Sequence, residues 1–311
     1  MKLALDPRRL LDRLRGNHSA SESSGAHEHE PSARTSPRSS SLPIVRKMGF
    51  DFAGADPEIP RHWLGGSAFG THVANGLNLV FPAGERFFVR SVNHYLDELH
   101  DPVLRDRVRR FYGQEGQHAK EHERFFAILR AQGLDIDRFL SAYQKIGYDW
   151  LEPKVPHLLR LSITVALEHY TAVFAEHALS ADFLSVHAPK PVSELLLWHA
   201  CEEIEHKDVA FDVLREIDDG YALRIAGLVM ATGLLIGFWT FAAATLLRQE
   251  PDLDLARFVR EGRRALAQRQ LGGQKMAHAF STYLAPDFHP SQIDNYQLAR
   301  DYLERIGRVD A

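Results

Sequence analysis

The chain has 311 residues, 45% of them hydrophobic and 25% charged, and its formal net charge is -4. This composition is that of an ordinary globular protein. The negative balance provides no basic field for nucleic acid, so we expect no nucleic-acid partner. A single cysteine, Cys201, excludes an intrachain disulfide and fits a reducing compartment. We therefore expect a cytoplasmic protein.

The N-terminal segment differs in composition from the rest. Residues 1–44 are rich in serine, proline and charge and contain few large apolar side chains. Such a segment cannot bury enough surface to offset the entropy lost on ordering, so we predict a disordered tail. The opening stretch MKLALDPRRLLDRLRG is followed by no apolar core, which makes it a poor secretory signal.

The chain from about residue 45 has helical periodicity, because apolar residues recur at spacings of three and four. The best-defined helix has Asp101 as its capping residue, Pro102 at its first position and Gly133 after its end. It spans about 30 residues, or ~45 Å.

Three further long helices complete the predicted bundle. Two of them begin near Pro156 and Pro191. The earliest begins near Pro82 and continues a preceding helix across a break at that proline. We therefore predict an all-α fold, in which residues 45–220 form a ferritin-like four-helix bundle and residues 221–311 a helical extension.

Two of the predicted helices carry a Glu-x-x-His pair. Glu115 and His118 form the first pair, and Glu203 and His206 form the second. Residues three apart lie on the same face of a helix, so each pair presents a carboxylate and an imidazole together. A single pair in an acidic helix is more often a solvated face than a ligand pair, so the pairs alone decide little.

The other two helices each contribute a glutamate in an apolar setting, Glu85 and Glu168. Glu85 alone is also explained by the dipole of a helix start, but Glu168 would be an expensive unpaired carboxylate in a core. The order Glu, Glu-x-x-His, Glu, Glu-x-x-His is that of ferritin-like bundles with two metal ions. Four carboxylates balance two divalent cations, for which we expect iron, with manganese or zinc as alternatives.

The last helix offers a seventh ligand. His199, Glu203 and His206 share one stripe at i, i+4 and i+7. Glu202 points elsewhere, so we expect it to face solvent or to support a ligand. His122 lies one turn after His118 and is read as a supporting donor or, more simply, as a core or surface histidine.

Five blocks of the sequence resemble a known family. They are PRHWLGG, LVFPAGERFF, QEGQHAKEH, LEHYTA and WHACEEIEHKDVAFDV. The blocks resemble the bacterial family of predicted metal-dependent hydrolases, which is grouped with the ferritin-like proteins, and the resemblance covers about residues 45–290. It implies a metal-dependent protein with a ferritin-like bundle.

The metal site alone has a second, more distant resemblance. The spacing His-x-x-x-Glu-x-x-His, from His199 to His206, is similar to that of the arylamine N-oxygenases, which are non-haem di-iron enzymes with an additional histidine ligand. The chain departs from those enzymes nearly everywhere else, so their substrate class does not carry over.

A long apolar run follows the bundle. Residues 225–247 contain no charge and lie between Arg224 and Arg248, which is long enough to span a bilayer. The alternatives are a helix packed on the bundle and a helix hidden in a homodimer. The folded appearance of residues 249–311 argues against a simple span, so association with a membrane surface stays open.

Three functions fit the predicted site. The donor set of four carboxylates and three imidazoles favours a di-iron enzyme that uses O2 to oxidise a small apolar substrate, with an electron-donor protein as its partner. The first alternative is a hydrolase in which a hydroxide held between the metals attacks an ester or amide. The second alternative is metal storage without turnover.

Overall fold

A computed structural model describes residues 42–54, 58–251, 255–267 and 273–309. All regular structure in these ranges is helical, which confirms the predicted all-α fold. The predicted disordered tail lies outside the described residues, except for residues 42–44.

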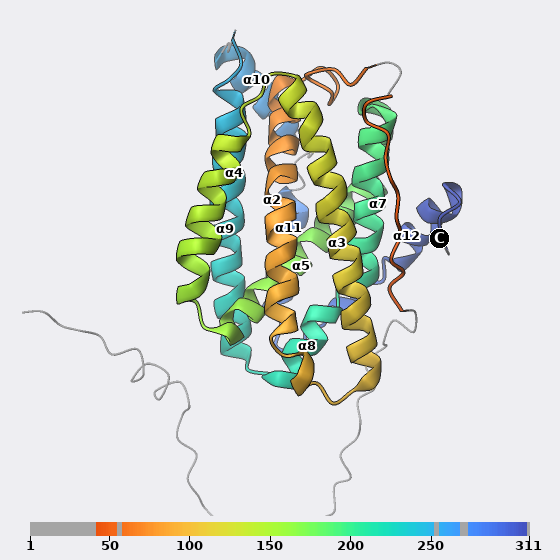
Figure 1. Ribbon diagram of the computed structural model, residues 1–311, viewed down its shortest axis with the longest axis vertical. Coiled ribbons are helices and arrows are strands. Elements are labelled where there is room, and N and C mark those ends of the chain that lie inside the picture. The colour runs from red at the N-terminus through yellow and green to blue at the C-terminus, as the bar shows by residue number, and fades with distance from the viewer. Residues whose placement is uncertain (1–41, 55–57, 252–254, 268–272, 310–311) are drawn as a thin grey trace, which may run out of the picture. The chain divides into compact units, whose positions relative to one another are not determined.

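Four long helices pack together around the site. They are α2 (Ala68–Asn93), α3 (Pro102–Ala131), α5 (His157–Ser180) and α7 (Lys190–His206). α2 packs against α3 and α5, and α7 packs against α5 and α3, so each helix has two neighbours in the bundle (Figure 1).

The ends of α3 follow the predicted signals. The Asp101 side chain accepts a hydrogen bond from the backbone N–H of Val103, and Pro102 occupies the first turn. Gly133, with φ of 80°, follows the C-terminal end in the left-handed region that favours glycine. These contacts explain why this helix was predictable almost to the residue.

The predicted break at Pro82 is wrong, because α2 runs through the proline without interruption. A proline lacks the N–H that would bond the carbonyl four residues earlier, here that of Asn78. Buried side chains before and after it, including Leu79 and Phe88, hold both halves of the helix in the bundle. Tertiary packing therefore outweighs the local cost.

The helix predicted to begin near Pro191 is interrupted, because α7 ends at His206 and α8 (Val209–Ile217) begins after a turn. The turn places two charged side chains against buried partners. The Lys207 ammonium binds the Asn295 side chain, and the Asp208 carboxylate pairs with Arg107. These tertiary contacts interrupt a pattern that reads as one helix in the sequence.

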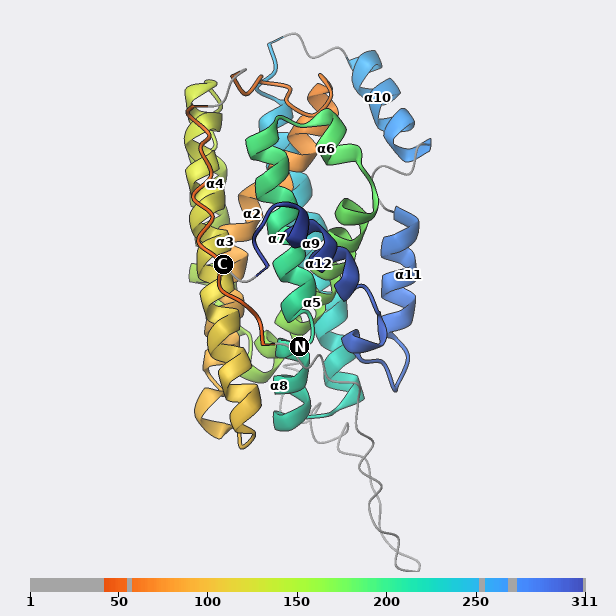
Figure 2. The same ribbon diagram turned by 90° about the vertical axis from the view of Figure 1, so that its right-hand side faces the viewer.

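The remaining elements connect these four helices or follow them. Those before α7 are η1 (Leu96–Glu98), α4 (Asp137–Tyr143), the π-helical segment η2 (Gln144–Leu151), η3 (Glu152–Lys154) and α6 (Phe183–His187). Those after α8 are α9 (Tyr221–Leu247), α10 (Leu255–Ala267), α11 (Gly273–Tyr283), η4 (Pro290–Gln292) and α12 (Tyr296–Arg305). Figure 2 shows α10 and α11 along one side of the bundle and α12 beside α7.

The apolar run forms α9, which packs along α2 and α5. Two glycines allow the close approach. A Cβ atom on Gly227 would lie 2.5 Å from the backbone oxygen of Ser162, and one on Gly76 would lie 2.9 Å from the backbone nitrogen of Ala243. One side of α9 therefore packs closely on the bundle along most of the helix.

Two described helices are long and apolar enough to cross a membrane, α5 and α9. In the most apolar stretch of α5, 61% of the residues are buried, as expected for a core helix. In that of α9, only 22% are buried. The helix is therefore neither a core element nor free of the bundle.

Candidate metal centre

The structure brings all seven predicted ligand residues together in the interior of the bundle. Each is at most 4% exposed. α2 contributes one glutamate, α3 a glutamate and a histidine, α5 one glutamate, and α7 the remaining three residues; together they are Glu85, Glu115, His118, Glu168, His199, Glu203 and His206.

One half of the cluster is arranged around His206. Its Nε2 atom lies 3.1 Å from Oε1 of Glu115, 3.4 Å from Oε2 of Glu168 and 3.6 Å from Oε1 of Glu203. Three helices therefore direct one imidazole and three carboxylates toward a common point.

The other half contains the remaining histidines. Nε2 of His199 lies 2.9 Å from Oε1 of Glu203 and 3.7 Å from Oε1 of Glu85. Nδ1 of His118 lies 3.7 Å from the same Glu203 oxygen and 3.9 Å from Oε2 of Glu115. Glu115 and Glu203 thus border both halves.

Three groups of three ligand atoms, each within 4.8 Å of one another, cover this cluster: Glu115, Glu168 and His206; Glu85, His118 and His199; and Glu115, His118 and Glu203. The first two groups share no residue, and the third joins them. Such a chain of overlapping groups has room for two neighbouring ions with carboxylates between them.

Unpaired polar atoms concentrate at this cluster. Among the described residues, 17 buried side-chain nitrogen and oxygen atoms have no hydrogen-bond partner, and nine of them belong to the seven residues. They include both carboxylate oxygens of Glu85, Glu115 and Glu168. Buried polar atoms are rarely left unpaired, so a concentration of this kind fits a cation-binding role.

The electrostatics of the cluster also fit a cation. Burial raises the pKa of Glu85 and of Glu168 well above the usual range. Burial lowers the pKa of His206, but the carboxylates of Glu203 and Glu168 outweigh it and raise that pKa. Burial thus disfavours the ionised form of Glu85 and Glu168, and two divalent ions would supply the positive charge that balances all four carboxylates.

Hydrogen bonds outside the cluster orient two of the imidazoles. Nε2 of His118 lies 3.2 Å from Oε2 of Glu202, so its Nδ1 faces the carboxylates. Nδ1 of His206 lies 3.0 Å from Oε1 of Gln114, so its Nε2 faces them. Partners of this kind fix the ring and the tautomer of a metal-binding histidine.

A third set of hydrogen bonds orients the ring of His199. Nδ1 of His122 donates to the side-chain oxygen of Asn78, and its Nε2 lies 2.5 Å from Nδ1 of His199. Burial lowers the pKa of His122 well below its usual value, so the ring is neutral and its Nε2 accepts. His199 therefore donates through Nδ1 and presents the Nε2 lone pair to the cluster. His122 is a buried core histidine, as the simpler reading has it, and its contacts with Asn78 and His199 also fit the supporting role.

Glu202 does not face solvent, which was one of its two expected positions. Its side chain is fully buried, and Oε1 accepts hydrogen bonds from Trp198 Nε1 at 2.9 Å and from Arg46 at 3.1 Å. Arg46 also binds Glu205 through two hydrogen bonds. Sequence reasoning missed Arg46 because it lies in the segment before the first helix, with no spacing that links it to the site.

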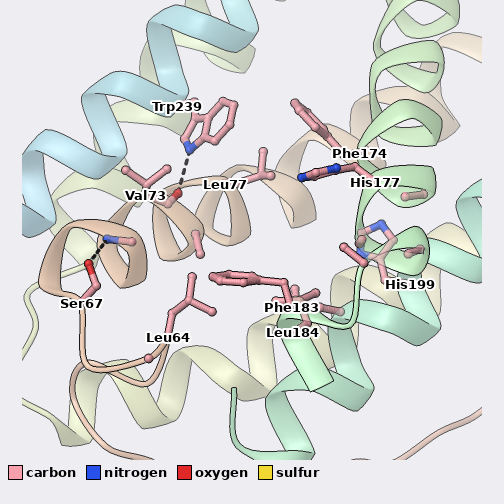
Figure 3. A pocket seen from close by; sticks show the side chains of 18 of the residues that line it. Leu64, Ser67, Val73, Leu77, Phe174, His177, Phe183, Leu184, His199 and Trp239 are labelled. Atoms are coloured by element: carbon pink, nitrogen blue, oxygen red, sulfur yellow. Dashed lines mark hydrogen bonds between the residues drawn. The ribbon is translucent and has the colours of Figure 1, made fainter. Parts of the chain in front are cut away.

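An apolar cavity of about 580 Å³ leads to the cluster. Its lining includes exposed Gly66 and Arg264 and also buried His199 and Glu203, so it runs from the surface to the ligands. Figure 3 shows aromatic and aliphatic side chains around it, with His199 on its wall. The labelled apolar residues are Leu64, Val73, Leu77, Phe174, Phe183, Leu184 and Trp239.

A second cavity, of about 100 Å³, reaches Glu85. It shares Leu77 and Phe81 with the first, so these side chains separate the two spaces. The hydroxyl groups of Tyr143 and Tyr148 lie 2.6 Å apart in its lining. Neither tyrosine has a sequence spacing that would have placed it here.

A fourth group of potential ligands lies elsewhere, at the start of α2 and the end of α9. Nε2 of His62 and of His72 lie 2.9 and 2.6 Å from the two carboxylate oxygens of Glu250. Nε of Arg61 lies 3.0 Å from the same carboxylate. Because Arg61 already supplies a positive charge, this group is an ion-pair network that ties α9 to α2.

The comparisons with known proteins agree with this geometry. A family model described as "Predicted metal-dependent hydrolase" matches residues 44–294, which is most of the chain. No curated protein and no solved structure gives a significant match.

Proposed function

The chain belongs to the family of predicted metal-dependent hydrolases, and we propose that it is a dinuclear enzyme that hydrolyses an ester or amide carrying an apolar chain. The single observation behind the proposal is the apolar cavity that ends at His199 and Glu203 of the seven-residue cluster. Family membership favours hydrolysis over the O2-dependent oxidation that the sequence alone ranks first.

The seven residues would hold two ions, with His206 and Glu168 in one half and His118, His199 and Glu85 in the other. Glu115 and Glu203 border both halves and would help to hold the ions in either half. A pair of divalent ions at such a site lowers the pKa of a water molecule and polarises a carbonyl oxygen.

The protein's own contribution is orientation. Three side chains each form a hydrogen bond with one nitrogen of a cluster imidazole, so that the other nitrogen faces inward. They are Glu202, Gln114 and His122. These supporting side chains are buried, so solvent does not compete for their hydrogen bonds. The rings therefore keep their positions as charge develops during a reaction.

The walls of the cavity would select the substrate. Leu77, Phe81 and Phe174 offer no charge and few hydrogen-bonding groups, so an acyl or alkyl chain would gain by leaving water. A volume of about 580 Å³ is in the range of cavities that hold small ligands. Phe81 also packs on His199, with ring centroids 4.7 Å apart, which limits water at the cluster.

O2-dependent oxidation of an apolar substrate is the second candidate. The donor set favours it, since four carboxylates with the two imidazoles of the Glu-x-x-His pairs, buried in a helical bundle, are the arrangement of di-iron bundles, to which His199 adds a third imidazole. Iron is the metal that this candidate requires, whereas zinc or manganese would also serve hydrolysis.

A reconstitution experiment separates the candidates. Metal-free protein would be loaded under anaerobic conditions with zinc, manganese or ferrous iron and offered nitrophenyl esters of increasing acyl length. We expect cleavage without O2, and we expect Glu115→Ala to abolish it. Glu121→Ala is the matched control, because Glu121 is buried on the same helix but bonds to Arg124 and to the backbone of Phe50.

Two outcomes would contradict hydrolysis. If no metal supports ester or amide cleavage, the leading proposal fails. If the ferrous protein instead consumes O2 and continues to do so with a reductant, the second candidate replaces it. Uptake that stops after one cycle would indicate storage of oxidised iron.

A further inference from the structure

We propose that α9, α10 and η2 form a docking surface for an anionic lipid bilayer, from which the apolar cavity takes its substrate. The choice of substrate source rests on the proposed function, whereas the surface itself rests on side chains outside the metal centre. The partner is a bilayer with acidic head groups, and a second copy of the chain is the competing occupant.

The exposed face of α9 is an apolar stripe. Exposed positions recur along the helix at Ala222, Ala226, Val229, Gly233, Ile236, Gly237, Thr240 and Phe241. The spacing of three and four places them on one face. Val229 is 60% and Ile236 58% exposed, and no charged residue interrupts the stripe.

Neighbouring elements extend this apolar face. Of the 11 large hydrophobic side chains that are exposed in the described ranges, seven lie on α9, η2 or α10. η2 contributes Ile146 and Trp150, and the Lys154 ammonium lies 4.0 Å from the Trp150 ring. Tryptophan and lysine together are typical of the boundary between lipid and water.

α10, which packs on α2 and lines the cavity together with α9, carries exposed basic side chains. Arg260 and Arg263 are exposed, as is Val259 between them and the start of the helix. A helix with arginines and apolar residues on its outer side binds the surface of an anionic membrane. Each arginine near such a surface adds to the attraction.

The cavity opens at the same elements. Trp239 of α9 and Glu261 and Arg264 of α10 line it, and Trp239 lies less than one turn after exposed Ile236. Oε2 of Glu261 accepts a hydrogen bond from Ser67 Oγ at 2.6 Å, which holds α10 against the start of α2. The cavity and the apolar stripe therefore share α9, and a chain leaving a bilayer at this surface would lie beside the cavity.

The packing of α9 disfavours both a transmembrane span and a dimer interface for this helix. A span across the bilayer would strip Leu228, Ala231 and Leu246 from the bundle, where each is fully buried. A two-fold dimer through this surface would bury the exposed arginines of α10 in both copies, which costs their desolvation. It would also cover the entrance of the cavity.

Sedimentation with vesicles tests the surface. Full-length protein would be mixed with vesicles of phosphatidylcholine containing about one third phosphatidylglycerol, and with vesicles of phosphatidylcholine alone. We expect binding to the anionic vesicles, and a loss of at least about tenfold in the partition coefficient for the Arg260→Glu/Arg263→Glu variant. Ile236→Asp and Val229→Asp should each weaken binding as well.

Val103→Asp is the matched control, since Val103 is 55% exposed on α3, outside this surface. It should bind as the wild type does. Metal content and helical circular dichroism should be unchanged in every variant, which excludes unfolding as the cause.

Three results would overturn the proposal: no binding to anionic vesicles, equal binding to neutral ones, or a dimer in solution that Ile236→Asp converts to monomers. Failure of the proposed function is distinguishable, because a protein that binds vesicles but cleaves no ester contradicts only the chemistry. Cleavage of a short soluble ester without vesicle binding contradicts only the surface.

Discussion

The Nε2 atom of His118 lies 3.2 Å from Oε2 of Glu202, and the opposite nitrogen of the same ring lies 3.7 Å from Glu203. One imidazole thus connects a carboxylate outside the cluster to one within it. Arg46 and Trp198 hold the outer carboxylate from its other oxygen. The path from Arg46 to the cluster is buried throughout, so its members should tune the metal without touching it.

Glu202→Gln should therefore weaken metal binding by about 10- to 100-fold, because the amide no longer supports the basicity of the His118 ring. Competition with a chelator of known affinity measures this change. Glu194→Gln on the same helix is the control, since its side chain is 36% exposed and pairs with Lys190. Equal metal affinities in both variants would mean that Glu202 does not influence metal binding at the site.

Filling the cavity should change the preferred chain length of the substrate. Ala178 lines the cavity, so Ala178→Trp would occupy part of its volume. We expect turnover of long-chain esters to fall while that of short ones persists and metal content stays unchanged. Ala131→Trp, at the exposed end of α3, should alter neither. A uniform fall across all chain lengths would mean that the cavity does not hold the chain.

The sequence predicted the parts of this structure that depend on local spacing. The caps of α3 and the Glu-x-x-His pairs follow from residues within one or two turns of each other. The order of the four bundle helices was then enough to place Glu85 and Glu168 beside the pairs. The structure brings these residues together, although their binding of metal stays a prediction.

The parts that spacing does not encode were missed. Arg46 reaches Glu202 across 156 positions, and Asn78 reaches His199 only through His122. The continuity of α2 through Pro82 was likewise mispredicted, because helix packing around the proline decides it. Long-range contacts of this kind leave no periodic signal in a single sequence.

The crossing of α5 and α9 offers a matched pair of glycines. Gly227→Ala would place a Cβ atom 2.5 Å from the Ser162 backbone oxygen, which should cost about 1 to 3 kcal/mol of unfolding free energy. Gly233→Ala on the same helix has open space and should stabilise by about 0.5 to 1 kcal/mol. Urea denaturation of both variants measures the difference. Equal effects would mean that α9 does not pack on α5 as described.

The Glu250 network should make stability depend on pH in a specific window. Burial opposes ionisation of Glu250, but His72, His62 and Arg61 outweigh it and lower its pKa to about 2. A folded-state pKa below the usual 4.5 means that the stabilisation is present above about pH 4.5 and is lost as the pH falls toward 2.

Glu250→Gln should consequently be less stable than the wild type at pH 7, and the difference should shrink as the pH falls below 4.5. Urea titrations at several pH values measure this, with exposed Glu304→Gln as the control. A difference that is constant with pH would show that the carboxylate charge is not the cause.

The number of metal ions per chain tests the central claim most directly. Elemental analysis of metal-free protein reloaded with ferrous iron or zinc should give two ions per chain in the wild type and in Glu121→Ala. It should give at most one in Glu115→Ala and in Glu203→Ala, while helical circular dichroism is retained, because these carboxylates border both halves of the cluster. Two ions retained in both of those variants would contradict the assignment of the site.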